Sequence, residues 1–125
     1  MSHFTQVETQ FRDIEALKDA CQELGLPVVA NSIARGYDGN QIAGEFVIGL
    51  SGPYDAALNR RPDGTYAVTA DLWQGHVEKE LGTGFCRLRQ LYGVHKTTRE
   101  ARTRGYTVQR RSQPNGGITL SLCRA

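Results

Sequence analysis

Residues 54–73 read YDAALNRRPDGTYAVTADLW, and this stretch predicts a β-hairpin. Its middle part, residues 60–64, supplies proline, aspartate and glycine at the point where the chain must reverse. After that turn the side chains alternate, so that Tyr66, Val68 and Ala70 share one face of a strand. Together with the apolar segment 42–50, the stretch indicates a meander of antiparallel strands over residues 33–73.

The segment before the meander predicts a strand, a helix and a short second strand. Residues 4–11 alternate like a strand with β-branched residues on one face. Asp13 is a good helix N-cap, and apolar residues then recur at helical spacing until Gly25, a candidate C-cap. Residues 26–30 follow as the short strand.

The segment after the meander predicts a second helix over residues 85–104 and a hairpin. Phe85, Leu88, Leu91, Tyr92 and His95 fall on one sector of that helix. Two arginines further along, at positions 99 and 102, rotate into the same sector. Either the buried stripe ends at position 95, or these arginines use the edge of the core with their charged ends in solvent. Residues 106–111 and 118–123 read as strands joined by the turn at 114–117.

This order of elements predicts a single α+β domain covering residues 1–125. We expect one antiparallel sheet with two helices on one face, in a ferredoxin-like variant.

Charge is unevenly distributed along the 125 residues, although the formal net charge is only +2. Residues 1–85 carry 6 basic and 12 acidic side chains, a net of −6. Residues 86–125 carry 9 basic and 1 acidic, a net of +8. Such asymmetry indicates an anionic partner or two oppositely charged surfaces that attract each other within the chain.

Several classes of protein are excluded by composition. No apolar stretch approaches the 18 residues of a membrane-spanning helix, and the first residues lack the basic and apolar segments of a secretory signal. The three cysteines, Cys21, Cys86 and Cys123, form no CxxC pair, which favours a reducing, cytoplasmic compartment.

Colinear markers make the chain resemble a known family. They are Met1-Ser2-His3-Phe4-Thr5, residues 12–17, Arg35-Gly36-Tyr37, Asp63-Gly64-Thr65-Tyr66, Ala70-Asp71-Leu72-Trp73, Tyr92, His95-Lys96, Glu100-Ala101-Arg102 and Gly105-Tyr106. In this order they resemble the conserved hypothetical reading frame thirty-five family of cyanobacteria and algal plastids. The resemblance implies a small soluble protein of the cyanobacterial cytosol or plastid stroma, of unknown function. It also implies a partner, either an AAA-type ATPase or another small companion protein.

No catalytic constellation is present in the sequence. Nucleophile-elbow, Walker and GxGxxG motifs are absent, as is any metal-ligand spacing, so we expect no enzyme activity, metal or cofactor. His95 could act as a base, although a single histidine at a core edge is more often structural. Cys86 lies near a helix start and before Arg87, which favours a reactive thiol, whereas free cysteines are usually small buried hydrophobes.

Residues with the character of protein-contact sites lie in a loop, at a strand end and on the second helix. The loop around Tyr37 combines a cation, an aromatic ring and two glycines, although it could also be a solvated connector. Trp73 ends a strand and could line a partner groove or belong to the core. The candidate partner-binding residues are Arg35, Tyr37, Trp73, Tyr92, His95 and Lys96.

The basic third of the chain gives an alternative, binding to RNA or another polyanion. The residues that would contact phosphates are Arg87, Arg89, Arg99, Arg102, Arg104, Arg110 and Arg111. The competing interpretation is that these arginines pair with the acids of residues 8–23 in the same chain.

Three functions therefore follow, in order of preference. The first is a non-enzymatic accessory or assembly protein that acts through protein contacts. The second is polyanion binding through the basic third. The third is a small-molecule or redox function at Cys86 and His95.

Overall fold

The computed structural model describes residues 4–124, so the family marker Met1-Ser2-His3 lies outside the described residues. Its main sheet has five antiparallel strands in the order β1-β5-β4-β3-β2. Their bounds are β1 (Phe4–Val7), β2 (Val28–Arg35), β3 (Gln41–Ile48), β4 (Ala56–Arg60) and β5 (Tyr66–Asp71). The hairpin predicted over residues 54–73 is confirmed, with Ala56 opposite Ala70 and Arg60 opposite Tyr66.

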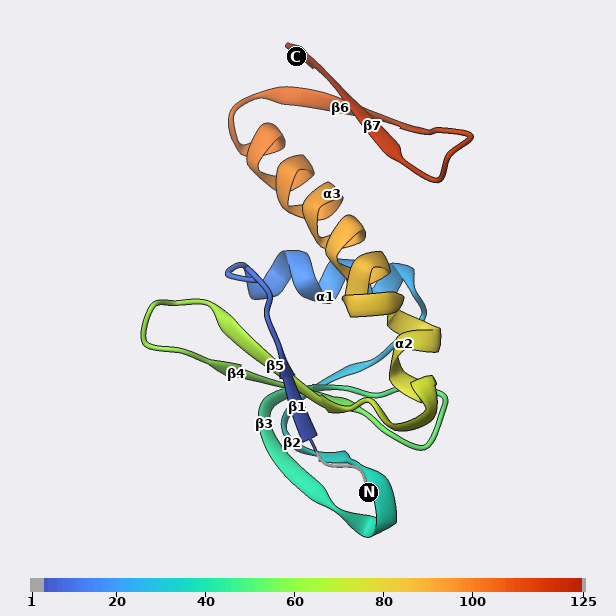
Figure 1. The fold of residues 1–125 in the computed structure, drawn as a ribbon. Coiled ribbons are helices and arrows are strands. Elements are labelled where there is room, and N and C mark those ends of the chain that lie inside the picture. Colours follow the sequence, from blue (N-terminus) through green and yellow to red (C-terminus); the bar gives the residue numbers. More distant parts are fainter. Residues whose placement is uncertain (1–3, 125) are drawn as a thin grey trace.

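The helices lie on one face of this sheet (Figure 1). They are α1 (Ile14–Glu23), the short α2 (His76–Leu81) and α3 (Cys86–Thr103). The predicted N-cap of α1 is confirmed, because Asp13 Oδ1 accepts the backbone N–H groups of Glu15 and Ala16. The main core joins the helices to the sheet, with Leu17 and Leu88 from the helices packing with Leu58 and Val68 from the strands. The short helix α2 was not predicted from the sequence.

The C-terminal hairpin does not join the main sheet, so the prediction of a single sheet is wrong. Strands β6 (Tyr106–Ser112) and β7 (Ile118–Arg124) form a separate two-stranded sheet. The reason is the length of α3, whose 18 residues carry the chain about 27 Å along the helix axis. Gly105, with φ +86°, then reverses the chain, and Gln90 Nε2 on α3 donates to the Gly116 carbonyl at the hairpin tip.

The ferredoxin-like topology is not confirmed. A ferredoxin-like fold interleaves its strands through two split βαβ units. Here α1 crosses from one edge strand, β1, to the opposite edge strand, β2, and the next strands return in sequence as a meander.

The β2–β3 hairpin is bent, because its pairing is interrupted at Asn31, which adopts φ +50°. In a regular strand, residues an even number apart face the same side. Val28 packs against the main core, whereas Ala34 lies in a second small cluster with Val47 and Ala57 on the opposite face of the sheet. The outer half of the hairpin therefore folds across that opposite face.

Glycine is required at position 44 because of this bend. A Cβ atom there would lie 2.6 Å from the Phe46 carbonyl oxygen and 3.2 Å from the Ala57 Cβ. By contrast, a Cβ at Gly93, within α3, would meet nothing within 4 Å.

We therefore expect opposite effects from the same substitution at these two glycines. Gly44→Ala should lower the free energy of unfolding by about 1–3 kcal/mol, because the added methyl group meets backbone atoms. Gly93→Ala should raise it by about 0.5–1 kcal/mol through helix propensity. Urea denaturation measures both, and a Gly44→Ala protein as stable as the wild type would contradict the bent hairpin.

Candidate functional site

Two aromatic residues 36 positions apart in the sequence form one exposed pair, Tyr37 and Trp73. Their ring centroids lie 5.8 Å apart with an interplanar angle of 57°. Tyr37 is 40% exposed and Trp73 is 38% exposed, which makes them two of the few large exposed hydrophobic residues in the described chain. Each begins a 3₁₀ turn, η1 (Tyr37–Gly39) and η2 (Trp73–Gly75).

A buried carboxylate holds both aromatic residues in place. Asp71 is fully buried at the end of β5, and its Oδ2 accepts the Tyr37 backbone N–H at 2.9 Å. Its Oδ1 accepts the Trp73 backbone N–H at 3.0 Å. Asp38 and Gln74, the residues after each aromatic, both have φ +55°, a region that residues other than glycine rarely adopt. Left-handed residues of this kind cluster at binding and catalytic sites.

Arg35 lies beside this pair and is anchored by Asp55. Its Nε and Nη2 atoms each donate to the Asp55 carboxylate at 2.8 Å, and Nη2 also donates to the Gly52 carbonyl at 2.9 Å. Burial of Asp55 acts to raise its pKa, but hydrogen bonds from Arg35 and from the Leu50 backbone outweigh it, so this pKa lies below its ordinary value. The Arg35 side chain positions the loop at residues 50–55 and remains half exposed, two residues before Tyr37 in the chain.

The loop at residues 50–55 is fixed from its other side by α2. Glu80 accepts the backbone N–H groups of Ser51 at 2.7 Å and Gly52 at 3.1 Å. Tyr54 packs edge-on against His76 with ring centroids 5.3 Å apart. Burial, followed by the nearby Asp71 carboxylate, raises the pKa of Tyr54. We call the exposed surface formed by Arg35, Tyr37 and Trp73 the hairpin-tip surface.

The other three predicted partner-binding residues lie on α3 and contact different groups. The buried Tyr92 hydroxyl accepts the backbone N–H groups of Arg12 and Asp13, both at 3.0 Å. His95 Nε2 lies 2.7 Å from Glu23 on α1, and Lys96 pairs with Glu100 within α3 at 2.8 Å. The structure therefore brings together Arg35, Tyr37 and Trp73 but does not bring Tyr92, His95 and Lys96 to them.

Several of the basic residues pair with acids or carbonyls of the same chain. Arg99 pairs with Asp19 through two hydrogen bonds of 2.5 and 3.1 Å. Arg110, on β6, binds both carboxylate oxygens of Glu23 at 2.8 and 2.6 Å. The partners of two others are carbonyl groups: Arg89 donates to Glu8 and Arg87 donates to Glu80. Of the two arginines predicted to continue the helical stripe, Arg99 thus forms an ion pair with α1, whereas Arg102 is exposed.

The side chains of three arginines of the predicted polyanion-binding set form no hydrogen bond or ion pair with another described residue. They are Arg102, Arg104 and Arg111, and all three are exposed.

The cysteines do not gather with other reactive groups. Cys86 is the exposed first residue of α3, and His95 lies nine residues further on, about 13 Å along the helix axis. Burial raises the pKa of Cys21 to about 12. Within residues 4–124, no three His, Cys, Asp or Glu side chains are grouped so that they could hold a metal ion.

Comparison with known proteins identifies the family. Residues 20–120 match the family described as "Protein of unknown function (DUF1257)". This chain belongs to the DUF1257 family. It is 30% identical over 127 residues to "Uncharacterized protein ycf35" of the red alga Pyropia yezoensis, covering 99% of this chain and 98% of the relative. It is 28% identical over 128 residues to the protein of the same name from the cryptophyte alga Guillardia theta, with the same coverage.

The resemblance to the reading frame thirty-five family is thereby confirmed. No solved structure matches the chain. Among the described residues, no helix has the length and apolar character needed to cross a bilayer.

The ion pairs around Glu23 predict a specific sensitivity to acid. Hydrogen bonds from Arg110, then from His95, lower the Glu23 pKa from an ordinary 4.5 to about 2 against the opposing effect of burial. The stabilisation is therefore complete above pH 4.5 and is lost as the pH falls toward 2, because the unfolded chain takes up the proton first.

We expect Glu23→Gln to remove that part of the acid dependence. Thermal unfolding across pH 2–5 measures it, and the melting temperature of the variant should fall less steeply than that of the wild type. Glu15→Gln is the control on the same helix, since Glu15 forms only a 3.7 Å pair with Lys18. Parallel curves for Glu23→Gln and the wild type would contradict this role.

Proposed function

We propose that this DUF1257 chain is a non-enzymatic accessory or assembly protein that binds a protein partner through the hairpin-tip surface. The observation that carries the proposal is the Tyr37–Trp73 pair, exposed and fixed by the buried Asp71 carboxylate. Tryptophan, tyrosine and arginine are the residue types that contribute most to binding energy at protein interfaces.

The rigidity of the pair supports this function further. Ordering side chains and loops on binding costs free energy, and residues already held in place avoid much of that cost. Tyr37 and Trp73 share one buried anchor, and the neighbouring loop is held by Arg35 and Glu80. A surface that packed these rings only for stability would have no need to leave both well exposed.

The partner is proposed to be a protein of the same compartment, cyanobacterial cytosol or plastid stroma. The AAA-type ATPase or small companion protein implied by the family resemblance is the first to test.

Loss of the aromatic pair should abolish partner recovery. We expect Trp73→Ala and Tyr37→Ala to remove a protein that co-purifies with the wild-type chain from the native cell in mild salt, because both remove central contacts. Quantitative mass spectrometry of the purified fractions measures this. Val29→Ala is the matched control, because Val29 is an exposed hydrophobic residue on β2 outside the surface. Equal recovery with Trp73→Ala and Val29→Ala, both folded by circular dichroism, would contradict the proposal.

A second candidate, polyanion binding, is favoured by the exposed Arg102, Arg104 and Arg111. Each phosphate contact steepens the dependence of affinity on salt concentration. The double variant Arg102→Ala/Arg111→Ala should lower the log–log salt slope for single-stranded RNA by about 1.4, measured by fluorescence anisotropy. Arg60→Ala, which removes an exposed arginine from β4, should leave it unchanged. RNA binding that is undetectable or insensitive to salt would exclude this candidate.

A further inference from the structure

The C-terminal hairpin is a regular two-stranded ladder, and the outer edge of its second strand, β7, pairs with no other described strand. Seven pairs run without a bulge from Tyr106 opposite Arg124 to Ser112 opposite Ile118. No third strand joins it among the described residues. Two-stranded sheets gain independent stability only by adding strands or by packing on a helix, and this one packs on α3, which contacts β6 more than β7.

The edge strand β7 lacks the features that normally protect an edge. Such features are charged side chains, proline, bulges and short length. β7 has no charged residue from Ile118 to Cys123, and its one charge, Arg124, lies at its end, whereas β6 carries Arg110 and Arg111 within the strand.

Both edges of the main sheet are protected by comparison. β1 is only four residues long. β2 is kinked at Asn31 and follows Pro27. The carbonyl of its last residue, Arg35, accepts the Asp55 backbone N–H, and the Arg35 backbone N–H donates to the Asp55 carboxylate. The contrast makes β7 the long strand edge that is free to pair.

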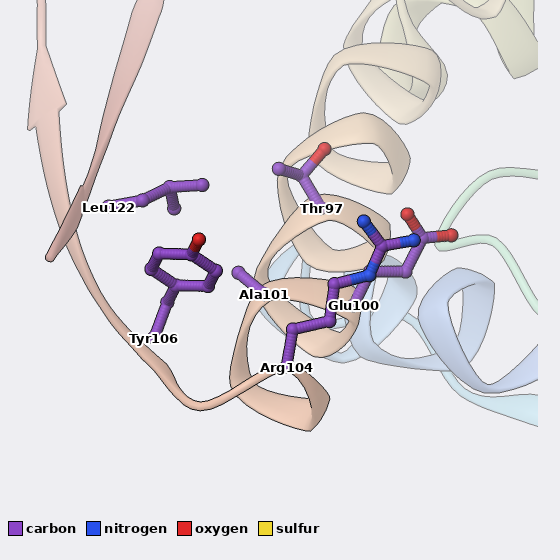
Figure 2. A pocket seen from close by; sticks show the side chains of 6 residues that line it. All are labelled: Thr97, Glu100, Ala101, Arg104, Tyr106 and Leu122. Atoms are coloured by element: carbon purple, nitrogen blue, oxygen red, sulfur yellow. The ribbon is translucent and has the colours of Figure 1, made fainter. Parts of the chain in front are cut away.

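Apolar surface is also left uncovered beside β7. Leu122 is 47% exposed. It borders a cavity of about 270 Å³ between the hairpin and the end of α3, also lined by Ala101, Tyr106 and Arg104 (Figure 2). Leu122 and Tyr106 of the hairpin lie opposite Thr97 and Ala101 of α3, whereas the ends of the Arg104 and Glu100 side chains point away from the hairpin (Figure 2).

We propose that β7 pairs antiparallel with β7 of a second copy of this chain, giving a four-stranded sheet across a twofold axis. A pairing centred on Ser121 sets Leu122 beside Leu120 of the second copy, so the exposed apolar side chain is covered. It also sets Arg124 opposite Ile118 of the second copy, so like charges are not opposed. The charge distribution of β7 favours this occupant, because a strand facing its own copy must avoid opposing like charges and β7 confines its charge to one end.

Sedimentation equilibrium over a range of concentrations tests the pairing in the full chain. The wild type should be a reversible dimer. Ser121→Lys places two lysines opposite each other at the axis and should raise the dissociation constant roughly fivefold. Gln109→Lys is the matched control, because Gln109 pairs with Ser121 across the hairpin but lies one strand away from the edge. It should leave the dissociation constant unchanged.

A second measurement tests the register. In a Cys86→Ser/Cys123→Ser background, which removes both exposed cysteines, Ser121→Cys should form a disulfide-linked dimer on mild oxidation, since facing Cβ atoms lie about 4.5–5.5 Å apart. A wild type that is monomeric at every concentration, or equal weakening by Ser121→Lys and Gln109→Lys in folded proteins, would overturn the proposal. Trp73→Ala should remain dimeric, so this test is separate from that of the hairpin-tip surface.

Discussion

The buried carboxylate of Asp71 is the constraint on which the candidate site depends. A carboxylate removed from water requires donors, and Asp71 takes two of them from the backbone of Tyr37 and Trp73. Meeting that requirement brings the tip of the β2–β3 hairpin to the end of β5. The hairpin reaches this place only because it bends at Asn31 and passes close over Ala57 at Gly44. A single buried group thus connects the irregular backbone of one hairpin with the exposure of two aromatic rings.

Elements with strong local signals could be predicted from the sequence. The cap at Asp13, the turn at residues 60–64 and the helical spacing from Leu88 to His95 are each encoded within a few neighbouring residues. The placement of the last hairpin could not be predicted in this way, because it follows from the length and direction of α3. The bend at Asn31 could not be predicted either, because no local signal marks it and the outer half of the hairpin is buried by residues far away in the sequence, with Ala34 in a cluster with Val47 and Ala57.

Only part of the candidate site could be predicted, because the sequence shows residue types but not contacts between residues that are far apart in the chain. Arg35, Tyr37 and Trp73 are conspicuous by residue type, and the structure brings them together. Asp55 and Asp71, which hold them, were missed because their partners lie 20 and 34 residues away in the sequence. The one available signal was an acid, Asp71, ending a strand of alternating buried residues. Conversely, Tyr92 has the type expected of a contact residue, but its hydroxyl is occupied by the backbone at the start of α1.

Part of the charge asymmetry of the chain is neutralised by ion pairs between its own residues. Arg99 and Arg110 find their counter-charges on α1, so part of the positive C-terminal region binds the negative N-terminal region and fastens α3 and β6 to the domain. Each surface ion pair of this kind contributes little to stability. Two such pairs on α1 also constrain how α1 lies relative to α3 and β6. The unpaired arginines then lie on α3, its C-terminal end and β6, while most of β7 stays uncharged. Because charge on an edge strand opposes pairing, this distribution separates the surface available to an anionic partner from the edge available to another strand.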